Sequence, residues 1–131
     1  AARIRDDVHD NNHRGSDGWR GDNIQIAFAA DLPWTGGEWS APWHELGLTL
    51  TPEGPEFHGL AGAELAIRRE GMVTIYEAAM PWRELSARLP QAGAFAFGLQ
   101  VNDADGQGRK GFWQWADIKR LDRMRAFRLE G

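Results

Sequence analysis

"AFAFGLQVND", residues 94–103, places a large apolar side chain at every second position. Because successive side chains of a β-strand point to opposite faces, Phe95, Phe97, Leu99 and Val101 share one face. The opposite face carries only alanine and glycine up to Gly98, and then the amides Gln100 and Asn102. This pattern predicts a strand whose apolar face joins the core and whose small residues are covered by a helix or a loop.

Other stretches have the composition of short strands separated by turn signals. Residues 72–80 are rich in β-branched and aromatic side chains, which indicates a strand buried on both faces. Residues 1–10 resemble the end of a strand, and further strands are expected at 23–31, 44–54, 63–71, 111–115 and 125–131. Proline and glycine interrupt any period in residues 33–43, so a long loop is expected there.

One segment, "MPWRELSARLP" at residues 80–90, favours a helix. Pro81 suits a first helical turn, Trp82, Leu85 and Leu89 follow at spacings of three and four, and a final proline stops the helix. We expect Trp82 to anchor this helix to the core. The predicted fold class is therefore all-β, an antiparallel β-sandwich with one short helix.

Chain length and composition exclude several classes of partner and of site. The chain has 131 residues and a net charge of −4, and we expect it to form a single β-sandwich domain over residues 1–131. The negative charge argues against nucleic acid and membranes as partners, and no apolar run approaches the length of a membrane span. The absence of cysteine excludes disulfides and thiolate metal sites. Because the first residues resemble a strand end, we expect a domain excised from or truncated within a larger protein, with N-terminal strands missing.

Amides and tryptophans are the candidate ligand-binding residues. Gln100 and Asn102 stand at a strand end, where planar amides can bond the hydroxyls of a sugar. Trp19 lies in a glycine-flanked turn, so we expect it to be exposed and able to stack on a sugar ring. Trp113 and Trp115 share one face of their strand, and we expect them to brace the sandwich.

Two acidic stretches are candidate cation sites. In "DADGQG", residues 103–108, Asp103 and Asp105 precede a glycine, which is typical of a calcium loop and equally of a plain hairpin turn. The calcium loop and the plain turn both stay open as interpretations. An EF-hand is excluded, because aromatic residues stand where its last carboxylate would be. In "RDDVHDNNH", residues 5–13, His9 and His13 are a weak zinc signal, and we expect solvated loop histidines.

The sequence contains none of the catalytic motifs that would indicate an enzyme. Gly-x-Ser-x-Gly, a glycine-rich phosphate loop and His-Glu-x-x-His are all missing. Carboxylate pairs for glycoside hydrolysis can arise wherever two acids meet in space, but the sequence favours no pair. We therefore expect a protein that is not an enzyme.

Several stretches together resemble carbohydrate-binding module family 9 and its bacterial relatives among the DOMON-like β-sandwiches. They are "DDVH", "WRGDNIQIAF", "YEAAMPW", "QVNDADGQGRKGFWQWAD" and the closing "FRL", in that order over about residues 3–129. The resemblance implies a non-catalytic sugar-binding module that contains structural calcium. It also implies an extracellular or periplasmic location and tethering to other domains such as a glycoside hydrolase.

The resemblance assigns roles to individual residues. Trp19 matches the first of two tryptophans between which the best known members hold a glycan end. Gln25 stands in place of a hydrogen-bonding glutamate, and Gln100 matches a strand glutamine that contacts sugar hydroxyls. Arg109 matches the arginine after the turn. Asp6 matches the aspartate that closes a strand before the polar loop, and the expected metal set is Asp6, Asp103 and Asp105.

Two features of the family are missing here. Residues 118–127, "IKRLDRMRAF", lack the second tryptophan, and residues 44–51, "HELGLTLT", lack an arginine. We treat Trp34, Trp39 and Trp43 as possible replacements for the missing stacking partner.

We therefore expect a sugar to stack on Trp19 while its hydroxyls are bonded by Gln25, Gln100, Asn102 and Arg109. Two alternatives stay open. One is a structural β-sandwich whose ancestral site has decayed. The other is a DOMON-like haem module, in which Met80 and either His44 or His58 would be the axial ligands.

Overall fold

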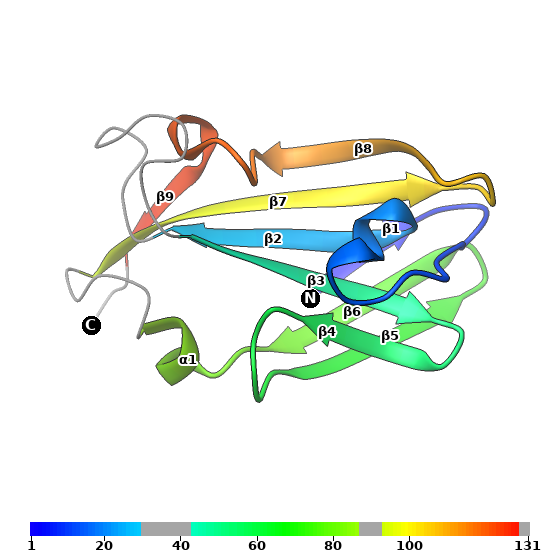
Figure 1. Cartoon of the computed structure of the whole chain (residues 1–131), viewed down its shortest axis with the longest axis horizontal. Coiled ribbons are helices and arrows are strands. Elements are labelled where there is room, and N and C mark those ends of the chain that lie inside the picture. Colours follow the sequence, from blue (N-terminus) through cyan, green and yellow to red (C-terminus); the bar gives the residue numbers. More distant parts are fainter. Residues whose placement is uncertain (30–42, 87–92, 129–131) are drawn as a thin grey trace.

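The computed structural model describes residues 1–29, 43–86 and 93–128. Within these residues the strands form two sheets that pack face to face (Figure 1). The smaller sheet has the order β1-β6-β5 and the larger one β4-β3-β2-β7-β8, with β9 also paired to β7. Every pairing is antiparallel, so the predicted antiparallel β-sandwich is confirmed.

The strands lie close to the predicted positions, with one addition. The smaller sheet consists of β1 (Ala2–Arg5), β6 (Val73–Ala79) and β5 (Glu64–Glu70). The larger sheet contains β4 (Gly54–His58), β3 (Trp43–Thr51), β2 (Asn23–Ala29), β7 (Ala94–Ala104), β8 (Arg109–Ala116) and β9 (Arg125–Arg128). Sequence analysis missed β4, because Pro55 interrupts its pattern. An edge strand such as β4 tolerates proline.

The described helices are short. They are the 3-10 helices η1 (Gly15–Arg20) and η2 (Leu121–Arg123) and the α-helix α1 (Trp82–Ser86). None of them is long and apolar enough to cross a membrane. The start of α1 agrees with the predicted helix, and its expected end lies outside the described residues.

The hydrophobic core lies between the two sheets. Alternating apolar residues of β2 and β3 meet Ile67 and Tyr76 of the smaller sheet, and the apolar face of β7 packs against them as predicted. In β6 only Thr74 to Tyr76 are buried on both faces. The buried members of the core are Ile24, Ile26, Phe28, Leu46, Leu48, Ile67, Tyr76 and Leu85.

The outer face of the larger sheet is divided into an alanine half and an amide half. The register of β2 and β7 pairs Ala27 with Gly98 and Gln25 with Gln100. Residues 117–124 cover the alanine half, where Ile118, Leu121 and Met124 pack against Ala27, Ala29 and Ala96. The prediction that a helix or a loop covers these small residues is confirmed. The amide half lies beside η1 and contains the candidate site.

Three tryptophans lie differently from the predictions. Trp82 is 45% exposed, although its ring contacts Phe95, and Leu85 is the buried residue of α1 in the core. Trp113 stands opposite Val101 and therefore on the inner face, yet it is 59% exposed, because a three-stranded sheet covers only part of a six-stranded one. Trp115 is also exposed, although it contacts Phe97 and Phe127.

Some predictions concern residues outside the described part of the chain. These include the predicted loop at 33–43 up to its last residue, together with Trp34 and Trp39. The backbones of Trp43 and His44 belong to β3, but their side chains are not described.

Candidate functional site

A row of hydrogen-bonded amide side chains crosses the amide half of the outer face. It consists of Asn23 and Gln25 on β2, Gln100 and Asn102 on β7, and Gln114 on β8. Gln100 Nε2 donates to Gln25 Oε1 at 3.1 Å and to Asn102 Oδ1 at 2.8 Å, and Gln114 Nε2 donates to Gln100 Oε1 at 2.7 Å. These bonds fix the orientation of each amide, so the row is a preorganised polar surface.

Asn102 is the most fully bonded member of this row. Its Nδ2 donates to Asn23 Oδ1 at 2.6 Å and to Gln25 Oε1 at 2.8 Å. Its Oδ1 accepts from Gln100 and, at 3.2 Å, from Arg109 Nη1. An amide has two donors and one acceptor oxygen with two lone pairs, and protein groups occupy all of these positions. The geometry therefore favours a role for Asn102 in positioning its neighbours.

Trp19 and Arg109 form an aromatic and cationic pair beside the amide row. Trp19 belongs to η1, which contacts β2, β3, β4 and β7. Its side chain is 37% exposed, as predicted. The Arg109 guanidinium lies 5.1 Å from the centre of the Trp19 ring and 5.1 Å from that of Phe112, within cation–π range. Arg109 therefore reaches back from the start of β8 and links Trp19 to Asn102.

A pocket of about 260 Å³ opens beside Trp19. Glu45, which sequence analysis missed, lines it and accepts a hydrogen bond from Gln25 Nε2. The sequence pattern could have indicated Glu45, because it alternates with the core residue Leu46 and therefore belongs to the outer face of β3. The lining residues are Gly15, Ser16, Trp19, Asn23, Gln25, Glu45, Leu46, Gly47 and His58.

The predicted sugar-binding residues come together on one face of the larger sheet. Trp19 and Gln25 line the pocket. Gln100 and Asn102 are buried in the amide row beside it, and Arg109 stacks on Trp19. The side chains come from two parts of the chain that are far apart in the sequence, η1 with β2 and β7 with β8.

The predicted metal residues also meet. One carboxylate oxygen from each of Asp6, Asp103 and Asp105 lies within 4.8 Å of the other two. The Lys110 ammonium lies 2.5 Å from Asp105 Oδ2 and 3.9 Å from Asp103 Oδ2, and the hydrogen bond to Asp105 raises the pKa of Lys110. The three carboxylates suit calcium, which prefers oxygen ligands, but Lys110 already supplies a positive charge at two of them. The predicted hairpin turn is present, with positive φ at Gly106 and Gly108.

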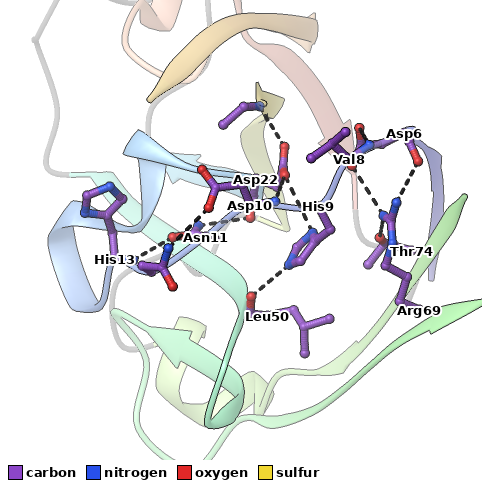
Figure 2. Close-up of polar contacts among 12 residues, drawn as sticks. Asp6, Val8, His9, Asp10, Asn11, His13, Asp22, Leu50, Arg69 and Thr74 are labelled. Atoms are coloured by element: carbon purple, nitrogen blue, oxygen red, sulfur yellow. Dashed lines mark hydrogen bonds and ion pairs between the residues drawn. The ribbon is translucent and has the colours of Figure 1, made fainter. Parts of the chain in front are cut away.

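A second polar cluster was not predicted. Asp22 is buried, and its two oxygens accept backbone N–H groups from Asp10 at 2.5 Å and Ala104 at 2.8 Å. Burial raises the pKa of the Asp22 carboxyl to about 6, although these hydrogen bonds lower it. Figure 2 shows the His9 ring between Asp22 and Leu50, with Nε2 at 2.9 Å from the Leu50 carbonyl oxygen. The expectation of a solvated loop histidine is wrong for His9, because its loop folds back against the end of β3.

Comparison with known proteins identifies the class of fold. No protein-family model and no curated protein matches this sequence. Among solved structures, a family 9 carbohydrate-binding module from Caldicellulosiruptor kristjanssonii in complex with glucose matches with a TM-score of 0.72 and 15% identity, over 98% of this chain and 68% of that one. A family 9 module from the same organism in complex with cellotriose matches with a TM-score of 0.68 and 16% identity, over 98% and 67%. The chain therefore has the β-sandwich fold of family 9 carbohydrate-binding modules.

Proposed function

We propose that this protein is a non-catalytic carbohydrate-binding module that recognises a mono- or oligosaccharide, such as a glycan end. One observation carries the proposal. The exposed Trp19 and the preorganised amides Gln25 and Gln100 converge on one face of a sandwich with the family 9 fold. An aromatic ring beside fixed amides is the combination that a pyranose requires, because one part of the sugar is apolar and the other is rich in hydroxyls.

In this mechanism the sugar enters the pocket beside Trp19 and packs its C–H face on the indole. Gln25 and Glu45 lie in the pocket wall and bond its hydroxyls. Gln100 extends the polar surface toward Arg109, while Asn102 holds Gln25, Gln100 and Arg109 in place. Arg109 covers part of the Trp19 ring and borders the sugar there.

Calcium at Asp6, Asp103 and Asp105 is a further part of this proposal. Bound calcium would tie the start of the polar loop to the β7–β8 turn. Convergence of the three carboxylates supports it, and Lys110 must move away from Asp105 for the ion to enter. We also propose that the module is tethered to other domains, such as a glycoside hydrolase, in an extracellular or periplasmic protein.

The described residues do not favour Met80 and His58 as a pair of haem ligands, and the side chain of His44, the other candidate, is not described. Met80 packs against the core between the sheets, whereas His58 lines the pocket on the outer face. Two axial ligands must approach one haem, and these two side chains lie on opposite sides of the larger sheet.

Isothermal titration of the protein with glucose, cellotriose and a panel of other mono- and oligosaccharides tests the proposal. We expect saturable heat with at least one sugar and no cleavage product by chromatography afterwards. No heat with any sugar would favour the alternative of a structural sandwich with a decayed site. Release of a shortened sugar would contradict the non-catalytic assignment.

A further inference from the structure

A cavity of about 560 Å³ has Asp6, His9 and Asp22 in its wall and shares no lining residue with the Trp19 pocket. One ligand atom from each of these residues lies within 4.8 Å of the other two. Two carboxylates and one imidazole are a donor set found around zinc and similar ions. The cluster shares Asp6 with the set of Asp6, Asp103 and Asp105, and it differs from that set by its nitrogen ligand.

The orientation of His9 determines which of its nitrogens is free. Nε2 lies 2.9 Å from the Leu50 carbonyl oxygen, which can only accept, so Nε2 carries the proton in the neutral ring. Nδ1 then bears a lone pair. It is buried, it has no hydrogen-bond partner among the described residues, and it faces Asp22 Oδ2 at 3.7 Å. Two electron-rich atoms thus face each other where little solvent reaches, since only 15% and 7% of the two side chains are exposed.

The surroundings hold the other two ligands in position. Asp22 is fixed by the backbone N–H groups of Asp10 and Ala104. Asp6 accepts from the Val8 N–H at 3.2 Å and pairs with Arg69 at 3.3 Å, and Figure 2 draws this contact between Arg69 and Asp6. Arg69 therefore balances the negative charge of the Asp6 carboxylate. Among the described residues, no lysine or arginine is paired with Asp22.

We propose that Asp6, His9 and Asp22 bind a divalent transition-metal cation of the zinc class. The ion places a positive charge between the His9 lone pair and the Asp22 carboxylate, which the protein leaves facing each other. It also ties the polar loop that leads to η1 onto the end of the larger sheet, because Asp22 directly precedes β2. The site shares Asp6 with the proposed calcium site but has no residue in common with the Trp19 pocket.

Zinc chloride added to the metal-free protein tests this site by thermal unfolding and by isothermal titration. Zinc at a hundredfold excess over its Kd should raise the midpoint of unfolding by about 5 °C or more. His9→Gln should abolish the shift. His13→Gln removes the other histidine of the same loop and should keep it. No shift in the wild-type protein, or an equal shift in His9→Gln, would overturn the proposal.

A second measurement applies even if His9→Gln fails to fold. The ¹⁵N chemical shift of His9 Nδ1 in the wild-type protein should indicate a free lone pair without zinc and a metal-bound nitrogen with it. A protonated Nδ1 that zinc leaves unchanged would mean that a proton, held between His9 and Asp22, fills this position. That result would overturn the proposal, as would a calcium response with no zinc response.

Discussion

Replacing Trp19 with alanine is expected to weaken sugar binding by about tenfold or more while leaving the fold intact. Buried aromatic anchors at binding sites commonly contribute about 2 kcal/mol or more, and each 1.4 kcal/mol is a factor of ten in Kd. Trp19 makes cation–π contacts with Arg20 and Arg109, and it is absent from the core between the sheets. Isothermal titration should therefore show the loss, while the midpoint of thermal unfolding changes by only a few degrees.

Trp113→Ala is the matched control for this prediction. Trp113 is more exposed than Trp19 but points to the inner face, away from the amide row. We expect this variant to bind sugar as the wild-type protein does. Equal affinity of wild-type protein and Trp19→Ala, or a larger loss in Trp113→Ala, would place the sugar elsewhere.

Gly98→Ala is expected to have the largest effect on stability, about 3 kcal/mol or more of the free energy of unfolding. A Cβ at this position would lie 2.0 Å from the Asp117 carbonyl oxygen and 3.1 Å from the Ile118 Cα. Both are backbone atoms that no rotamer change can move aside. The segment at residues 117–124 must therefore lift from the alanine half, which exposes Ile118 and Leu121. Urea unfolding measures the change.

Gly111→Ala provides the comparison, since Gly111 lies in the neighbouring strand β8 of the same sheet. A Cβ there would meet nothing within 4 Å, so we expect a change within about 0.5 kcal/mol. Similar losses in the two variants would mean that a general strand effect of alanine, rather than the close approach of Asp117, determines the result.

The alternation in residues 94–103 contained most of the information about the fold. The large residues of β7 predicted the core face, and the small ones predicted the loop that covers the alanine half. The change from Gly98 to Gln100 on that same face marked the start of the site. The pairing of β7 with β2 then aligns Gln25 with Gln100 without any further assumption.

The missed features depend on long-range contacts that leave no local pattern. His9 and Asp22 are thirteen positions apart, and a loop without periodicity brings them together. Large aromatic residues on one face of a strand, such as Trp113 and Trp115, are typical of a buried face. Their exposure in this protein depends on how far the smaller sheet extends. Arg109 was predicted to contact the ligand, and its stacking on Trp19 became visible only once the β7–β8 turn had been placed.

Titration of ¹⁵N-labelled protein with cellotriose, followed by NMR, tests the central claim most directly. The account predicts saturable shifts of the Trp19 indole N–H and of the side-chain amides of Gln25 and Gln100, with little change at the indoles of Trp113 and Trp115. Shifts confined to Trp113 and Trp115, with the Trp19 pocket unaffected, would contradict it.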